Sequence, residues 1–356
     1  MIRVLVVDDS TFMRTALVSL LEEDPDIKVV GTAVDGRDAL KKAATLDPDV
    51  MTLDVEMPKL DGLATLQELM KTTPLPVLMA SALTEAGANS TFKALEYGAL
   101  DFIPKTMSND KNAFGEELRR KVKAIARKKS LVRLKFQRLK LQHEPPAQQR
   151  AACALQAGTQ ITPCKGPRDL VVIGVSTGGP PVVQKILSAL PGDLPACILV
   201  AQHMPQTFTG PFAKRLDGLC KLSVSEAVNG DKYKKGHAYV CPGGMHIGVR
   251  MRGSLPEVAV TEEPRDALYK PAVNVLMETA GKCMGPRTLG IMLTGMGSDG
   301  CDGAKTLRKT GGCLIAQSEA SCVVYGMPKA VVDEGLANQI LDADDIAQAI
   351  IAAVKG

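Results

Sequence analysis

Short apolar runs alternate with amphipathic helix-like stretches twice along this chain, and that alternation restricts the fold more than any other feature. The first series lies within residues 1–105. Its runs are rich in Val, Leu and Ile, as is typical of strands buried on both faces. They read RVLVVD, KVVGTA, VMTLD, PVLMA and ALDFIP, and helical patterns such as TFMRTALVSLLEE and GLATLQELMK separate them. Strands that alternate with helices predict a parallel sheet covered by helices on both faces.

A second series begins at Asp169. Its predicted strands read DLVVIGV, ACILVAQ, HAYVCP, MHIGVRM and RTLGIMLTG, and helical patterns run near residues 181–190, 271–283, 301–309 and 344–354. A chain of 356 residues has the length of two ordinary domains. We therefore predict an α/β protein with two doubly wound parallel-sheet domains. The first is flavodoxin-like, with strand order 2-1-3-4-5, and the second is Rossmann-like.

A stretch of different character separates the two series. From Asn109 to about Gln142 the pattern is helical and amphipathic. The segment that follows, HEPPAQQRAACALQAGTQITPCKGPRD, loses this periodicity and is rich in Pro, Gln, Gly and Thr, which is typical of a linker. We place the first domain at residues 1–106, a basic helix and linker at 107–168, and the second domain at 169–356.

Charge is spread unevenly along the chain, although the formal net charge is only +4. Residues 1–104 carry nine Lys and Arg against 17 Asp and Glu, a net of −8, whereas residues 105–140 carry 13 against three, a net of +10. The basic excess is one local stretch, RRKVKAIARKKSLVRLKFQRLK. We interpret it as a solvated helix face on the linker. Docking on an acidic partner and nucleic-acid binding are the alternatives.

The N-terminal segment and the cysteines indicate in which cellular compartment the protein is expected. The N-terminal apolar run in MIRVLVVDDS is short and stops at two aspartates, so neither a signal peptide nor a membrane span is expected there. The nine cysteines are scattered, odd in number and form no CxxC pair. This pattern predicts free thiols in a reducing cytoplasm, with no zinc site and no disulfide framework.

Acidic side chains of the first domain occur where predicted strands end. Asp8 and Asp9 follow the first strand and Asp54 follows the third, while Ser81 and Lys105 follow the fourth and fifth. In an open parallel sheet the carboxyl ends of the strands form the ligand-binding edge, so these side chains are expected to converge. Three crowded carboxylates repel one another, and a hard divalent cation such as Mg²⁺ relieves that repulsion.

These residues, with the motifs DVEMPKLDG and DFIPK, resemble a response-regulator receiver domain. The resemblance implies that Asp54 is the phospho-acceptor and that Asp8, Asp9 and Asp54 hold Mg²⁺. It further implies a phosphoryl contact from Lys105 and a switch pair formed by Ser81 and Phe102. A carboxylate nucleophile would thus become an acyl phosphate, whose added charge biases a two-state surface.

The turn VVIGVSTGGP in the second domain has two readings. As a dinucleotide fingerprint it would use Gly174 and Gly179, but serine stands where the second glycine of that motif belongs, and the next strand ends at His203 without a carboxylate. As a nucleophile elbow it fits G-x-S-x-G from Gly174 to Gly178, with Ser176 exposed on a tight strand-to-helix turn. The second reading needs a base and an acid.

Four histidines are available as the base. His203 follows the strand after the serine turn and is expected on the same edge of the sheet as Ser176. His143 lies by the linker, and His237 opens a strand. His246 lies within a strand and is interpreted as structural, with a place in the site as its alternative.

For the acid, LTGMGSDG is another strand that ends in a glycine-rich turn, and Asp299 is the candidate. Asp302 is expected on the helix that follows. The resulting order Ser…His…Asp differs from that of α/β-hydrolases, so it argues against that fold, but a triad is recognised by geometry and not by order.

The motifs GVSTGGP, AQHMP, YVCPGGMH and LTGMGSDG resemble the catalytic domain of chemotaxis protein-glutamate methylesterases. The resemblance implies Ser176 as nucleophile, His203 as base and Asp299 as orienting acid, without a cofactor for the esterase chemistry. Backbone N–H groups near Thr177 and Met296 become oxyanion-hole candidates. The chain departs from the family pattern in PAVNVL, where PSVDVL is expected, and in Cys301, where alanine is more common. We interpret Cys301 as a small buried residue, with an oxidation-sensitive thiol as the alternative.

The resemblance implies a phosphorylation-regulated hydrolase that demethylates glutamate methyl esters on chemoreceptor helices, releases methanol and deamidates glutamine as a side activity. Its expected partners are methylated chemoreceptors and a chemotaxis histidine kinase, met at the periphery of receptor arrays in the cytoplasm, with no DNA bound. The unphosphorylated receiver is expected to cover the Ser176 rim, and phosphorylation of Asp54 to loosen that contact. A nucleic-acid-binding response regulator and a phospho-switch adaptor with an inactive second domain are the rival hypotheses.

Overall fold

The computed structural model describes residues 1–105, 111–134, 166 and 168–355. The chain divides into two compact units, Met1–Thr159 and Gln160–Gly356. This division falls within the stretch 107–168 assigned to the basic helix and linker, and the domain boundaries themselves stay predictions. Each unit contains its own parallel sheet, which confirms the predicted fold class.

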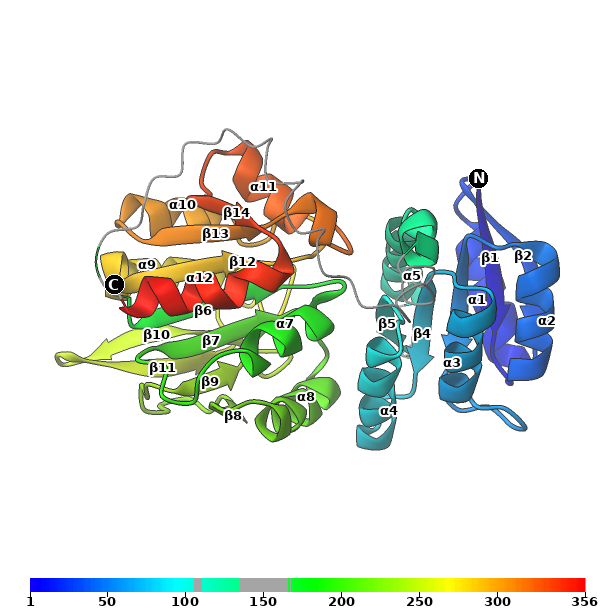
Figure 1. Ribbon diagram of the computed structural model, residues 1–356, viewed down its shortest axis with the longest axis horizontal. Coiled ribbons are helices and arrows are strands. Elements are labelled where there is room, and N and C mark those ends of the chain that lie inside the picture. Colours follow the sequence, from blue (N-terminus) through cyan, green and yellow to red (C-terminus); the bar gives the residue numbers. More distant parts are fainter. Residues whose placement is uncertain (106–110, 135–165, 167, 356) are drawn as a thin grey trace, which may run out of the picture. The chain divides into compact units, whose positions relative to one another are not determined.

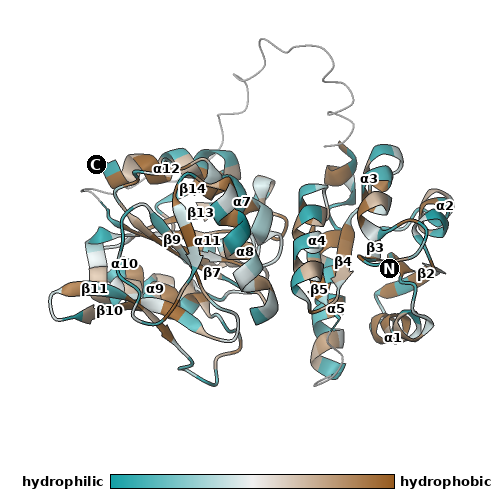
Figure 2. Cartoon of the chain, turned by 90° about the horizontal axis from the view of Figure 1, so that it is seen from below, coloured by the Kyte–Doolittle hydropathy of each residue, from teal (hydrophilic) through white to brown (hydrophobic). Residues whose placement is uncertain are grey.

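The first unit is a five-stranded parallel sheet with the predicted strand order, β2-β1-β3-β4-β5 (Figure 1). Its strands are β1 (Ile2–Val7), β2 (Ile27–Ala33), β3 (Val50–Asp54), β4 (Val77–Ser81) and β5 (Asp101–Pro104). Its helices are α1 (Thr11–Glu22), α2 (Gly36–Leu46), α3 (Gly62–Thr72), α4 (Glu85–Glu96) and α5 (Lys111–Ala126). The helices carry both apolar and polar residues, visible on α4 and α5 in Figure 2, as expected for helices with one buried face.

Capping side chains start the helices just beyond the carboxyl ends of the strands. The side-chain oxygen of Ser10, Asp35, Asp61 or Thr84 accepts a hydrogen bond from the backbone N–H three residues later. Each such cap satisfies a donor that the first helical turn leaves unpaired and stabilises the helix by about 1 kcal/mol. The chain therefore turns over the same edge of the sheet after each of these strands.

Helix α5 places its basic side chains against acidic groups of the first unit. Lys121 Nζ lies 2.6 Å from Asp101, and Lys123 Nζ lies 2.8 Å from Asp24. Further pairs are Arg119 with Glu23 and, beyond α5, Lys129 with Asp49 and Arg133 with Asp47. The interpretation as a solvated face is therefore wrong for these five side chains, because acidic groups of residues 1–104 supply their counter-charges. Residues 135–140 of the basic stretch lie outside the described residues.

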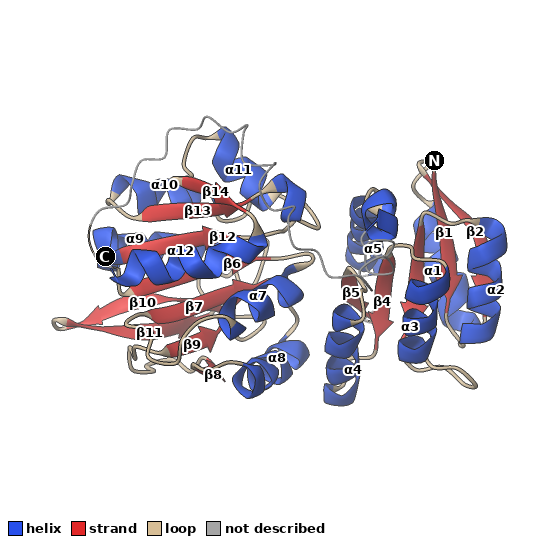
Figure 3. Cartoon of the chain, viewed as in Figure 1, coloured by secondary structure: helices blue, strands red, loops and turns tan. Residues whose placement is uncertain are grey.

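The second unit is a seven-stranded parallel sheet in the order β14-β13-β12-β6-β7-β9-β8 (Figure 3). Its strands are β6 (Leu170–Val175), β7 (Cys197–Gln202), β8 (Ser223–Glu226), β9 (His237–Val240), β12 (Thr288–Met292), β13 (Cys313–Gln317) and β14 (Gln339–Leu341). A separate antiparallel hairpin consists of β10 (His246–Arg252) and β11 (Leu255–Thr261). The strand order reverses at β6, between β12 and β7, and such a switch point is where ligands bind in α/β sheets.

Helices cover both faces of this sheet. They are α7 (Gly179–Ser188), α8 (Gln206–Leu219), α9 (Val273–Met284), α10 (Cys301–Lys309), α11 (Met327–Asp333) and α12 (Ala343–Lys355). Leu170 and Val172 of β6 belong to one core cluster with residues of α9, α10 and α11. The alternate residues Val171 and Ile173 are also fully buried but lie outside that cluster, on the face that Figure 3 shows covered by α7 and α12.

Most cysteines of the second unit agree with the expectation of free thiols. Six of them are free, whereas Cys313 at the start of β13 is disulfide-bonded, so the expectation is wrong for that residue. Cys153 and Cys164 lie outside the described residues. Within the described ranges, no helix has both the length and the apolar character needed to cross a membrane.

Candidate active site and receiver site

Ser176 lies on a tight turn at the switch point of the second sheet. Strand β6 ends at Val175, and α7 begins at Gly179. Between them Gly178 has φ +73°, and a Cβ at this position would lie 2.4 Å from Val323, so only glycine fits there. The side chain of Ser176 is half-exposed, and its position at the N-terminal end of α7 adds the favourable field of a helix start.

His203 follows β7 directly and lies beside Ser176. Its backbone N–H donates to the Val175 carbonyl at 3.0 Å, which continues the pairing of β6 with β7. The His203 Nδ1 atom lies 3.1 Å from Ser176 Oγ, and Nε2 lies 2.8 Å from Asp299 Oδ2. The three side chains therefore form one chain of hydrogen bonds across the ends of three neighbouring strands.

Asp299 is held by the start of helix α9 as well as by His203. Its Oδ2 accepts from the Val273 N–H at 2.7 Å, and its Oδ1 accepts from the Asn274 N–H at 3.1 Å. Burial alone would raise the pKa of this carboxyl, but the hydrogen bond with His203 and those two backbone donors outweigh it and hold the pKa below its ordinary value. Asp299 is thus ionised at neutral pH, with a fixed orientation.

The hydrogen-bond partners determine which nitrogen of His203 carries the proton. An ionised carboxylate only accepts hydrogen bonds, so Nε2 of the neutral ring is protonated and donates to Asp299. Nδ1 then presents its lone pair to the Ser176 hydroxyl. This arrangement can remove the serine proton as the oxygen attacks a carbonyl carbon.

Two backbone donors predicted for an oxyanion hole lie in the turns beside Ser176. Within the described residues, neither the Thr177 N–H nor the Met296 N–H has a hydrogen-bond partner. The turn that contains Met296 approaches closely, because a Cβ at Gly295 would lie 2.8 Å from the Ser176 Cβ. The Thr294 carbonyl also accepts from the Ser176 N–H at 3.0 Å. Both unpaired N–H groups are therefore available near the serine.

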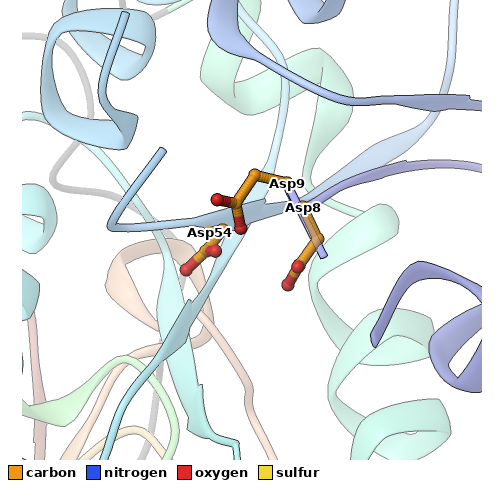
Figure 4. Close-up of side chains that lie close together, drawn as sticks. All are labelled: Asp8, Asp9 and Asp54. Atoms are coloured by element: carbon orange, nitrogen blue, oxygen red, sulfur yellow. The ribbon is translucent and has the colours of Figure 1, made fainter. Parts of the chain in front are cut away.

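The first unit brings together the carboxylates that its sequence predicts. One oxygen from each of Asp8, Asp9 and Asp54 lies within 4.8 Å of the others (Figure 4). Lys105 Nζ lies 2.7 Å from Asp8 and 2.6 Å from Asp54. Burial raises the pKa of Asp54, and Lys105 only partly offsets this. Burial by itself would lower the pKa of Lys105, but the hydrogen bonds to Asp54 and Asp8 outweigh burial and raise that pKa.

The donor set at this edge fits a hard divalent cation. Three carboxylate oxygens at mutual ligand spacing carry more negative charge than Lys105 neutralises, and Mg²⁺ prefers oxygen ligands. Asp9 is exposed while Asp8 and Asp54 are buried, so the cluster opens to solvent on one side. A cavity of about 560 Å³ adjoins it, lined by Asp9, Glu56, Met57, Pro58 and other residues.

The predicted switch residues lie on β4, which neighbours β3, and on β5, the edge strand beyond it. Ser81 ends β4 and is fully buried, and its carbonyl accepts from the Lys105 N–H at 2.8 Å. Phe102 on β5 is also buried, with its ring edge-to-face against Phe92 at a centroid distance of 6.5 Å. Phe102 is therefore packed inward here.

Comparison with known proteins identifies the family. The model of the CheB methylesterase family matches residues 171–350. A protein-glutamate methylesterase/protein-glutamine glutaminase of Lawsonia intracellularis is 50% identical over 99% of both chains. One of Nitratidesulfovibrio vulgaris, with the same name and the number 2, is 54% identical over 99% of both chains. The chain belongs to the CheB methylesterase family.

Other comparisons agree with membership in the CheB methylesterase family. The crystal structure of the Thermotoga maritima CheB methylesterase catalytic domain matches with a TM-score of 0.51 and 38% identity, covering 52% of this chain and 99% of that one. The response regulator receiver model matches residues 4–113. This chain therefore has a receiver domain followed by a CheB methylesterase domain.

Two side chains of this CheB methylesterase site were missed from the sequence. Gln202, the last residue of β7, is buried and donates to the carbonyls of Ser176 at 2.9 Å and His203 at 3.1 Å. Tyr269, in the loop before α9, stacks on the His203 ring. A polar residue at a buried strand end was a usable signal for Gln202, whereas nothing in the sequence around Tyr269 indicates its position.

Within the described residues, the remaining candidates make no hydrogen bond to Ser176, His203 or Asp299. His246 is fully buried and bonds to the backbone of Ala272 and Pro264, which agrees with its interpretation as a structural residue. His237 pairs with Ser225 at the edge of the sheet. Cys301 is buried beside Ala330, and burial raises the pKa of its thiol, as expected for a small buried residue. His143 lies outside the described residues.

Proposed function

We propose that this chain is a phosphorylation-regulated serine hydrolase that removes the methyl group from glutamate methyl esters of chemoreceptors. One observation carries the proposal: Ser176 Oγ and the Asp299 carboxylate bond to opposite nitrogens of His203, at 3.1 Å and 2.8 Å. Family membership supplies the substrate class, because the relatives are named as protein-glutamate methylesterases.

In the proposed reaction Ser176 Oγ attacks the γ-carbonyl carbon of the ester, and His203 Nδ1 takes the hydroxyl proton. Asp299, held by the Val273 and Asn274 N–H groups, stabilises the imidazolium that forms. The Thr177 and Met296 N–H groups receive the oxyanion, a contribution that typically lowers the barrier by about 3–4 kcal/mol. The C–O bond to methoxide then breaks as Nδ1 returns the proton, so methanol leaves and an acyl-serine remains.

Water completes the cycle by the same route. His203 Nδ1 removes a proton from water, the hydroxide oxygen bonds to the acyl carbon, and Ser176 Oγ leaves with the proton from Nδ1. The product is a glutamate side chain. Glutamine deamidation follows the same steps with ammonia in place of methanol, which agrees with the glutaminase part of the relatives' names.

The receiver domain is proposed to control this activity. Asp54 accepts the phosphoryl group as an acyl phosphate, and Lys105, 2.6 Å away, neutralises charge that develops on it. Asp8, Asp9 and Asp54 would hold Mg²⁺, which supplies further charge neutralisation when bound. Ser81 and Phe102 then respond to the added charge as the switch pair, and the phosphorylated receiver no longer covers the Ser176 rim.

The partners follow from this activity. Methylated chemoreceptors are the substrate and a chemotaxis histidine kinase is the phosphodonor, both met in the cytoplasm at receptor arrays. Against nucleic-acid binding stands the pairing of five basic side chains of residues 111–134 with acidic groups of the first unit.

Covalent labelling tests the assignment of the nucleophile. A fluorophosphonate should attach to Ser176, as read by peptide mass spectrometry, and methanol release from methylated receptor membranes should fall in proportion. Undiminished release from fully labelled protein would exclude Ser176 as the nucleophile.

A further inference from the structure

The aromatic ring of Tyr269 covers one face of the His203 imidazole. The two ring centroids are 4.4 Å apart, and the ring planes differ by 11°. The side chain of His203 is only 11% exposed, and Tyr269 itself is half-buried. A parallel stack at this distance constrains the tilt of both rings, because tilting either one would bring it into contact with the other.

This constraint is one that the hydrogen bonds of His203 do not supply. Its bonds to Ser176 and Asp299 leave the ring through Nδ1 and Nε2. The outer torsion of histidine has a broad energy profile, and hydrogen bonds tolerate some change of angle, so the two bonds alone leave a small rocking of the ring about Cβ–Cγ possible. The Tyr269 ring opposes that rocking from one face. The stack and the two hydrogen bonds together therefore fix the direction of the Nδ1 lone pair toward Ser176.

A buried histidine anchors the loop that carries Tyr269. The Nδ1 of His246 accepts from the Ala272 N–H at 3.0 Å, so its Nε2 carries the proton and donates to the Pro264 carbonyl at 3.1 Å. Both ends of the loop 264–272 are thus tied to one ring on β10. Burial lowers the pKa of His246, which favours the neutral form that these two bonds require.

The same loop meets the acid side of the site. The Tyr269 hydroxyl lies 3.7 Å from where a Cβ at Gly297 would be, in the turn that leads to Asp299. The loop ends at Ala272, three residues after Tyr269. The residue that follows is Val273, whose N–H bonds to Asp299. One anchored loop therefore reaches both the base and the acid.

We propose that Tyr269 is a positioning residue for the esterase reaction, which holds the His203 imidazole in plane with Ser176 and Asp299 through a stack fixed by the loop 264–272. The inference rests on the proposed function. It concerns the ring of Tyr269 and assigns no role to its hydroxyl in the chemistry.

Substitution of the ring in the full-length protein tests this role. Tyr269→Leu removes the aromatic face and should lower kcat by about 2- to 12-fold, the equivalent of aromatic pair energies, with KM for methylated receptor membranes unchanged. Tyr269→Phe keeps the face and should retain wild-type kcat. The rate at which a fluorophosphonate labels Ser176 should follow kcat across these variants, because that reaction uses the same base but no receptor.

Controls separate positioning from folding and from substrate contact. Leu268→Ala changes the neighbouring residue of the same loop, whose side chain is 86% exposed, and should leave kcat and the labelling rate unaltered. Thermal unfolding of each variant reports the integrity of the second domain. A Tyr269→Leu protein with wild-type kcat and labelling rate would overturn the inference, as would a loss seen only in KM or a loss equalled by Leu268→Ala.

A further control separates this inference from the proposed function. If Ser176→Ala abolishes methanol release while Tyr269→Leu has no effect, only the role of Tyr269 fails. If Ser176→Ala retains release, the proposed nucleophile is wrong, and the role of Tyr269 fails with it.

Discussion

The side-chain amide of Gln202 donates a hydrogen bond of 2.9 Å to the backbone carbonyl of Ser176, so the turn of the proposed nucleophile is tied to the strand that precedes the proposed base. The same amide donates to the His203 carbonyl at 3.1 Å. Because Gln202 is only 2% exposed, solvent does not replace these bonds. One buried group thus sets the spacing between two residues whose side chains must meet.

Removing this amide should separate the serine from the histidine. Gln202→Met keeps the length of the side chain but leaves the two carbonyls without that donor, which costs about 1–3 kcal/mol in stability. We expect kcat/KM to fall by about 10-fold or more, since small misplacements of reacting groups are expensive. Gln348→Met is the same change at an exposed position of α12, and it should leave the stability and kcat/KM unchanged. Equal effects of the two substitutions would contradict this account.

Asp299→Asn should impair catalysis through the histidine tautomer. Both carboxylate oxygens now accept backbone N–H bonds, so an amide must direct its NH₂ group at one of those donors or at His203. If it faces His203, Nε2 becomes the acceptor and Nδ1 carries the proton, which prevents Nδ1 from taking the serine proton. We expect kcat to fall about 10³- to 10⁴-fold, by analogy with other triads. The matched control is Asp302→Asn, three residues on and 81% exposed, which should retain full activity.

The lowered pKa of Asp299 predicts a pH-dependent part of the stability. A carboxyl whose pKa is depressed on folding adds stability that is present above its unfolded pKa, and that stability is lost as pH falls through the folded value. The stabilisation by Asp299 is therefore lost over a pH range that begins near pH 4, the ordinary pKa range of aspartate, and extends below it. Denaturant unfolding should show that the free energy of unfolding of the wild type exceeds that of Asp299→Asn at pH 7, and that this difference becomes smaller toward pH 3. A difference in the free energy of unfolding that stays constant or grows as the pH falls would show that the ionised Asp299 does not stabilise the fold.

Receiver control should disappear when Asp54 or the whole receiver is removed. Asp54→Asn removes the acceptor, so a small-molecule phosphodonor should no longer raise methanol release, and a chelator should have the same effect on the wild type by removing Mg²⁺. Deletion of residues 1–142 should raise basal release, because the proposed control makes the unphosphorylated receiver an inhibitor of the esterase. A truncated chain no faster than the intact, unphosphorylated protein would exclude inhibition by coverage.

Local patterns were sufficient to predict the site because its residues follow strands that are neighbours in the sheet. Strands β12, β6 and β7 lie side by side, so Ser176, His203 and the turn that carries Asp299 are at one edge of the sheet. The same reasoning gave the carboxylate cluster of Asp8, Asp9 and Asp54. These predictions needed only the rule that parallel strands end at a common edge.

Features that depend on tertiary paths were missed. The described strands β8, β11, β13 and β14 were not predicted; β14 is short and only partly buried, and β13 is an apolar run of five residues that periodicity cannot distinguish from helix. Tyr269 reaches His203 through an irregular loop, which no periodicity describes. The pairing of α5 with the acidic surface required knowledge of which face the helix packs on, although the opposite net charges of the two segments were visible in the sequence.

Methanol release from methylated receptor membranes tests the central claim most directly, with wild type, Ser176→Ala and Asp54→Asn each measured with and without a small-molecule phosphodonor. The account predicts release that Ser176→Ala abolishes, and a stimulation by the phosphodonor that Asp54→Asn removes while basal release remains. Release that persists in Ser176→Ala would contradict the proposed hydrolase, and stimulation that persists in Asp54→Asn would contradict its control by the receiver.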